Sequence, residues 1–226
     1  MTGSTHKIGG FTFSLLFLWI NAYLQILPIA FISIYTPFFM VGCILGALFP
    51  DIDHPKSTIF RYLWPIAWPI WLTQKIIRAI FKKKKTQFAK NVCSTVGHRG
   101  IAHWMTIAVA YMFLILCLLV YIKGYIALDI TFSIISFFLI GTTVGNVSHV
   151  VLDLFNETGL PLFAPFSFKR IHLANVKTGT RKSKKTIFTT SPSENIFILI
   201  LLGITIFLIY LNLKAIGIDI PITAIQ

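Results

Sequence analysis

The stretch 11–50, FTFSLLFLWINAYLQILPIAFISIYTPFFMVGCILGALFP, contains no charged residue and is almost entirely apolar. As a single helix it would extend about 60 Å, which is twice the hydrocarbon core of a bilayer, about 30 Å thick. The chain must therefore fold back once, and Pro28 and Pro37 bracket the predicted break. We predict two membrane spans, at about 9–30 and 33–49.

Three further apolar segments have the length of a membrane span, at 101–122, 126–147 and 195–213. Ser191-Pro-Ser-Glu194 before the last of them has the pattern of an N-cap, a proline at N1 and a glutamate at N3. The aromatic segment 59–81 is interrupted by prolines and cations, which predicts an interfacial or re-entrant helix, with a sixth span as the alternative. The predicted fold is therefore all-α, a single integral membrane domain over 1–226 with about five transmembrane helices.

The composition agrees with a polytopic membrane protein. Of 226 residues, 56% are hydrophobic and 12% are charged, about half the charged share of a soluble domain. The net charge is +13, and most cations lie beside hydrophobic segments, in the predicted loops at about 50–100 and 154–193. This placement indicates contact with anionic lipid headgroups, not with nucleic acid. With a cytoplasmic N-terminus, five spans leave only Lys123 and Lys214 of the Lys and Arg residues outside, which sets the predicted orientation.

All six histidines and five of the seven acids fall on the cytoplasmic side of this topology. The candidate metal ligands are His6, Asp51, Asp53, His54, His98, His103, His149, Asp153 and Glu194. His149 and Asp153 are four residues apart, so they share one helical face. Imidazole with carboxylate suits Zn²⁺, and also Mn²⁺ or Fe²⁺. Because the candidates exceed one tetrahedral site, we predict two or three ions, with zinc as the first choice.

Some of these residues have alternative or additional roles. Glu194 could instead belong to a capping box at the start of the last span. Asp53 is either a further ligand or the base that orients the attacking water. Arg99 lies near two histidines and would neutralise charge that develops on phosphoryl oxygens. His172, in a basic loop, is predicted to be a solvated side chain.

A series of motifs resembles the YdjM-type membrane-bound metal-dependent hydrolases. These motifs are Phe49-Pro-Asp-Ile-Asp-His-Pro-Lys-Ser57, Gly97-His-Arg-Gly-Ile-Ala-His103, Ser148-His-Val-Val-Leu-Asp153 and Gly159-Leu-Pro-Leu-Phe-Ala-Pro165. His6 and Glu194 match the family's early histidine and late glutamate. The resemblance implies a bacterial inner-membrane protein, distantly similar to the zinc-dependent phospholipase C and P1 nuclease enzymes. Those are all-helical and hold three zinc ions, which implies a phosphoester as the substrate.

The sequence therefore predicts a metal-dependent hydrolase that cleaves a phosphoester of a phospholipid or lipid-linked substrate at the cytoplasmic face. Anionic membrane lipids are the expected partners, and the oligomeric state is left open. A transporter or sensor of divalent metal would use the same ligands, but it would need ionisable groups near the middle of the membrane. A non-catalytic lipid-binding protein is the third alternative, and it leaves the clustering of ligands unexplained.

Overall fold

The chain is mainly helical in the part that the computed structural model describes, which is residues 1–25, 29–55, 57–82, 86–96, 103–123, 130–164, 166–179 and 188–218. The helices are α1 (Gly3–Leu24), α2 (Ile29–Gly46), η1 (Phe49–Asp53), α3 (Thr58–Tyr62), α4 (Trp64–Phe81), α5 (Gln87–Thr95), α6 (Met105–Lys123), α7 (Ile130–Asp153) and α8 (Pro192–Ala215). Two isolated β-bridges join parts of the segment between α7 and α8. The predicted all-α class is confirmed.

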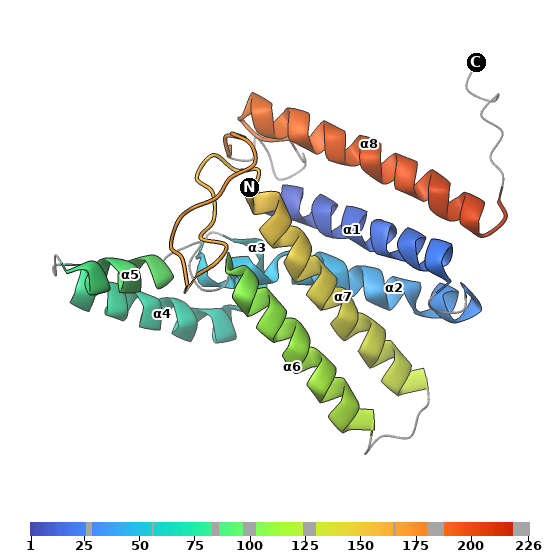
Figure 1. Ribbon diagram of the computed structural model, residues 1–226, viewed down its shortest axis with the longest axis horizontal. Coiled ribbons are helices and arrows are strands. Elements are labelled where there is room, and N and C mark those ends of the chain that lie inside the picture. The colour runs from blue at the N-terminus through green and yellow to red at the C-terminus, as the bar shows by residue number, and fades with distance from the viewer. Residues whose placement is uncertain are drawn as a thin grey trace.

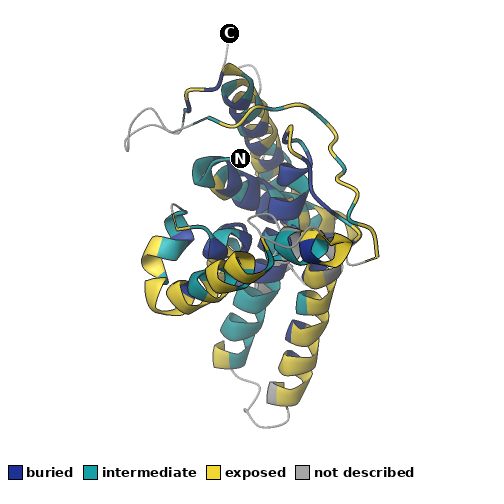
Figure 2. Cartoon of the chain, turned by 90° about the vertical axis from the view of Figure 1, so that its left-hand side faces the viewer, coloured by how far each residue is buried: buried dark blue, intermediate teal, exposed yellow. Residues whose placement is uncertain are grey.

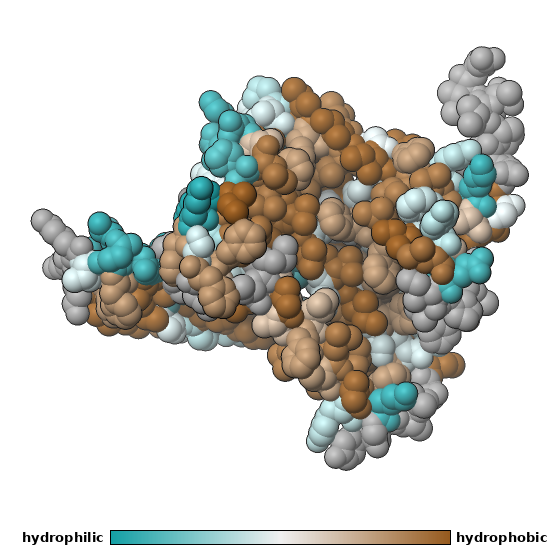
Figure 3. All heavy atoms as spheres, viewed as in Figure 1, coloured by the Kyte–Doolittle hydropathy of each residue, from teal (hydrophilic) through white to brown (hydrophobic). Residues whose placement is uncertain are grey.

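The five apolar helices form a bundle in which α7 is central (Figure 1). Helix α1 lies between α2 and α8, and α7 contacts α1, α2 and α6. Among the described residues, α1, α7 and α8 are long and apolar enough to cross a membrane, and Ile34–Gly46 and Ile107–Tyr121 are shorter apolar helices. Hydrophobic residues accordingly dominate the face seen in Figure 3. That α2 and α6 also span the membrane stays a prediction.

Two details of the predicted helices are wrong. Pro28 and Pro37 were expected to bracket the break between the first two spans. Pro28 lies outside the described residues, but Pro37 lies inside α2, and α1 ends earlier than expected, at Leu24, where Gln25 has a φ of 52°. Membrane helices tolerate an internal proline where neighbouring groups satisfy the backbone. The segment 59–81 was expected to form a single helix, but Leu63 divides it into α3 and α4, because Pro65 at the start of α4 favours a new helix there.

Helices α2 and α7 cross in close backbone contact because both carry glycines four residues apart. A Cβ on Gly46 would overlap the carbonyl oxygen of Thr142, and a Cβ on Gly145 would overlap that of Cys43. Gly42 and Gly141 meet the partner helix in the same reciprocal way. Small residues at this spacing let two membrane helices approach closely. The crossing lies next to the end of α2, so it fixes the position of the polar residues beyond it.

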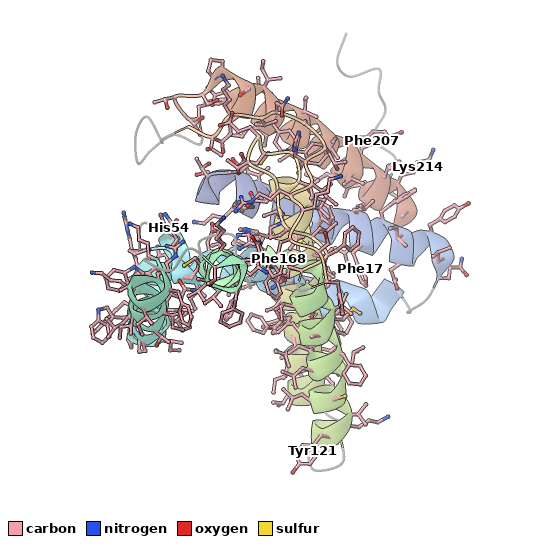
Figure 4. The ribbon with its side chains drawn as sticks, turned by 60° about the vertical axis from the view of Figure 1, so that its left-hand side comes forward. Phe17, His54, Tyr121, Phe168, Phe207 and Lys214 are labelled. Atoms are coloured by element: carbon pink, nitrogen blue, oxygen red, sulfur yellow. The ribbon has the colours of Figure 1, made fainter. Side chains whose placement is uncertain are left out.

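The polar ends of the bundle helices meet at one place. The starts of α1, α6 and α8 and the ends of α2 and α7 lie together, and buried residues gather there around the N-terminus (Figure 2). The opposite ends of α6 and α8, marked by Tyr121 and Lys214, lie far from His54 (Figure 4). The chain therefore alternates in direction from helix to helix, as the predicted topology requires.

Candidate metal centre

Five buried or nearly buried side chains converge where the bundle helices meet, and we call them the metal cluster. They are His6 of α1, Asp51 of η1, His103 before α6, and His149 and Asp153 of α7. His6, His103, His149 and Asp153 are each at most 2% exposed, and the Asp51 side chain is 15% exposed. They form two overlapping groups able to hold a metal ion, one of His6, His149 and Asp153 and the other of Asp51, His103 and His149.

His149 is oriented by the end of α2. Its Nδ1 lies 2.7 Å from the carbonyl oxygen of Ala47. Because a carbonyl can only accept, Nδ1 carries the proton and Nε2 keeps its lone pair. A histidine that donates one ring nitrogen to a carbonyl and presents the other is the usual arrangement of a metal ligand. The close crossing of α2 and α7 is what brings this carbonyl within reach.

The donor atoms around His149 are spaced as ligands of a common ion would be. His149 Nε2 lies 3.1 Å from His103 Nε2, 3.8 Å from Asp51 Oδ1 and 3.9 Å from Asp153 Oδ2. His103 Nε2 lies 3.5 Å from Asp51 Oδ1 and 3.8 Å from Asp153 Oδ2. Two ligands of a tetrahedral zinc ion, each about 2.1 Å from it, lie about 3.4 Å apart. The residues therefore fit a divalent metal ion.

Asp153 faces both groups of donors with its two oxygens. Oδ2 is the oxygen near His103 and His149. Oδ1 lies 3.4 Å from His6 Nε2 and 3.1 Å from the α-ammonium group of Met1. The His6 ring stacks on His149 at 3.7 Å between centroids, and its Nδ1 is buried without a hydrogen-bond partner among the described residues. His149 has a single ring nitrogen with a lone pair to offer, whereas Asp153 turns one carboxylate oxygen toward each group of donors.

The charge of Asp51 also suits a cation. Burial alone would raise the pKa of this carboxyl group, but attraction to His149 in its protonated form and a hydrogen bond from His103 outweigh burial and hold the pKa well below its usual range. Asp51 is therefore ionised at neutral pH and ready to accept a metal ion. The short helix η1, with Pro50 at its start, holds Asp51 against the end of α7.

The other candidate residues either stand outside these two groups of donors or fall outside the described residues. Asp53 is buried, and its Oδ2 accepts a hydrogen bond from Gln74 of α4 at 3.3 Å. His54 lies on the side of the molecule occupied by α3 and α4 (Figure 4). Neither group of donors includes Asp53, His54 or Glu194. His98 and Arg99 lie outside the described residues, so their predicted roles stay predictions. His172 is exposed, as a solvated side chain should be.

Glu194 does not form the capping box that its position in the sequence suggested. Its Oε1 accepts from the backbone of Thr2 and the hydroxyl of Thr5, both at 2.7 Å, and its Oε2 accepts from the backbone of Gly179 at 2.8 Å. The N–H of Ser191 donates instead to Thr189 Oγ1. The Glu194 carboxylate thus fastens the start of α1 and the segment after α7 to α8, a role that the sequence did not reveal.

We expect Glu194→Gln to weaken this junction, because an amide has one acceptor oxygen where the carboxylate has two. The loss of charge-assisted hydrogen bonds should cost about 1–3 kcal/mol of unfolding free energy. Thermal unfolding in detergent measures it, and Glu157→Gln, at an exposed position, is the control. Unchanged stability in Glu194→Gln would contradict the anchoring role. If the Glu194→Gln protein also lost bound metal, Glu194 would be a metal ligand as well.

The comparisons with known proteins agree with these features. Residues 1–216 match the family described as "YdjM inner membrane protein". Two curated relatives, each called inner membrane protein YdjM, come from Escherichia coli (strain K12) and Shigella flexneri. Each is 30% identical over 124 residues, which is 55% of this chain and 47% of the relative. The matched region thus spans about half the length of these relatives, and no solved structure matches. The chain belongs to the YdjM family of inner membrane proteins.

Proposed function

We propose that the protein is a metal-dependent hydrolase that cleaves a phosphoester of a phospholipid or lipid-linked substrate at the cytoplasmic face of the membrane. The observation that carries the proposal is the spacing of 3.1–3.9 Å between the donor atoms of His103, His149 and their two aspartate partners. Groups so close and so buried are costly unless they bind a cation or pair with one another.

The side chains of the site would have three roles: holding the metal, orienting water and neutralising the phosphoryl group. Asp51, His103, His149 and Asp153 would hold one ion, and His6 with the second oxygen of Asp153 would contribute to another. When bound, divalent zinc supplies Lewis-acid polarisation of the phosphoryl group and makes water more acidic near neutral pH. Asp53, which also accepts a hydrogen bond from Gln74, is the candidate to orient the attacking water, and Arg99 is the candidate to neutralise the phosphoryl oxygens.

A transport function is less well supported by the same geometry. The metal cluster lies where the polar helix ends meet, and the described interiors of α6, α7 and α8 carry no acidic or histidine side chain between their ends. A metal-conducting path would need such groups near the middle of the membrane. The described donors therefore form a site at one end of the bundle and not a path through it.

Hydrolysis is tested with purified protein in mixed micelles that contain phospholipids, and in parallel with the soluble diester bis(p-nitrophenyl) phosphate. We expect zinc-dependent release of phosphate or of a phosphorylated headgroup, lost on chelation and restored by zinc. His149→Ala should lower the rate to that of the chelated protein, whereas His172→Ala should retain it. A folded, zinc-loaded protein that cleaves none of these esters would contradict the proposed activity.

The cytoplasmic orientation makes a separate prediction. In a variant without Cys43, Cys93 and Cys117, single cysteines replacing Ser57 or Lys90 should react with a membrane-impermeant maleimide from the cytoplasmic side. A cysteine replacing Lys214, at the far end of α8 (Figure 4), should react from the opposite side. Labelling of positions 57 and 90 from opposite sides would show that the region of α4 crosses the membrane and would reject the five-span topology.

A further inference from the structure

An apolar groove of about 480 Å³ lies between Lys7 of α1, the end of α2 and helices α3, α6 and α7. Its size falls within the range of about 300–1,000 Å³ that is usual for small-molecule sites. Leu45, Leu48, Ile59, Tyr111 and Leu139 are among the residues that line it. None of the described residues fills it. A groove with such walls suits a hydrocarbon chain.

The groove runs in the direction that a membrane lipid would take. Its walls reach from Lys7 and Leu48, near the polar ends of the helices, to Phe138, which precedes His149 by three turns of α7, roughly 16 Å at 1.5 Å per residue. Hydrophobic residues cover most of the face of the bundle that Figure 3 shows. A lipid seated there would direct its acyl chain toward the membrane interior and its headgroup toward the metal cluster.

The groove carries a positive charge at its polar end. Lys7 is the one charged residue among the described residues that line it, and no described acid pairs with Lys7. Lys7 follows the cluster histidine His6 directly, and Phe49 in the groove wall begins η1, which carries Asp51. An ammonium group at this place complements a phosphate, whereas a neutral chain alone would leave it without a counter-ion.

We propose that this groove holds an acyl chain of an anionic glycerophospholipid and that Lys7 binds the lipid's phosphate group. The inference rests on the proposed function, because it names the class of substrate that the metal cluster would act on. Leu48 and Ile59 would contact the part of the acyl chain nearest the headgroup, and Tyr111 and Leu139 the part nearer its end. The lipid thereby places its phosphate at the end of the molecule where the metal cluster lies.

The test uses the full chain in phosphatidylcholine nanodiscs that contain a minor fraction of phosphatidylglycerol with a diazirine near the end of one acyl chain. After irradiation, mass spectrometry locates the adducts. We expect them on the groove residues of α2, α6 and α7. Lys7→Gln should lower labelling roughly tenfold, the cost of one charge-assisted contact, and Lys214→Gln, at the far end of α8, should not.

A second pair of variants tests the groove itself. Leu139→Trp and Leu45→Trp would fill it and should suppress labelling, whereas Ile206→Trp, on a lipid-exposed position of α8, should not. Adducts spread evenly around the bundle, or labelling unaffected by either groove variant, would overturn the inference. The experiment needs no turnover. Groove labelling without hydrolysis would reject the hydrolase alone, and hydrolysis of a soluble diester without groove labelling would reject the lipid groove alone.

Discussion

Replacing Asp153 by alanine is expected to remove all the metal from the protein, because this one carboxylate faces both groups of donors. Its Oδ1 lies 3.4 Å from His6 Nε2, and its Oδ2 lies 3.8 Å from His103 Nε2 and 3.9 Å from His149 Nε2. Loss of an outer-shell partner already lowers metal affinity about 10–100-fold. Loss of a carboxylate that faces both groups of donors should exceed that and leave no stoichiometric metal after purification.

His6→Ala is the informative comparison. His6 belongs to one of the two groups, so its removal should release part of the metal and leave the ion held by His103, His149 and Asp51. His172→Ala, in an exposed loop position, should retain the full metal content of the wild type. Metal analysis of the three variants after gel filtration measures the effect, and Asp153→Asn, which keeps the side-chain volume, covers the case in which the alanine variant does not fold. A folded Asp153→Asn protein with the full wild-type metal content would contradict the shared role.

The second large effect is expected at the crossing of α2 and α7. Valine at position 145 would drive its Cβ into the backbone of α2 at Cys43 and Ala47, and a backbone cannot move aside as the end of a side chain can. Overpacking of a core costs about 1–3 kcal/mol and occasionally more, and we expect the upper end of this range. The separation of α2 from α7 would also move the Ala47 carbonyl away from His149 Nδ1, so metal affinity should fall together with stability.

Gly203→Val is the matched control for this substitution. Gly203 lies in α8, and among the described residues no atom beyond its own stretch of helix lies within 4 Å of the place where its Cβ would be. The same change of residue should therefore leave the melting temperature and the metal content close to those of the wild type. Differential scanning fluorimetry in detergent, with metal analysis of the same samples, compares the two. Equal stability of the Gly145→Val and Gly203→Val proteins would contradict the close crossing of the helices.

The sequence predicts the helical class and the clustering of the polar residues because both follow from hydropathy. An apolar run must fold back within the membrane, and polar residues at the ends of successive spans must then meet on a common side. The prediction that His149 and Asp153 share one helical face is also confirmed, because their i, i+4 spacing depends on the geometry of one helix. These features need no knowledge of how the helices pack.

Features that depend on packing were beyond the sequence argument. The place of Pro37 inside α2 and the bonds of Glu194 to Thr2, Thr5 and Gly179 depend on groups distant along the chain. Asp53 follows Asp51 by two residues, yet the turn of η1 directs it to Gln74 of α4. The close crossing of α2 and α7, by contrast, could have been predicted from the sequence. Gly42 and Gly46, and Gly141 and Gly145, are small residues four apart in apolar segments, a spacing that indicates close helix packing.

The most direct test of the central claim is the metal content of the protein itself. The protein is purified in detergent without exposure to chelator, and its metals are measured by inductively coupled plasma mass spectrometry beside a His149→Ala/Asp153→Ala variant. We expect two or three equivalents of divalent metal, zinc first, in the wild type and none in the variant. Folded wild-type protein without stoichiometric metal would contradict the account, because the cluster of three histidines and two aspartates would then be satisfied by its own hydrogen bonds.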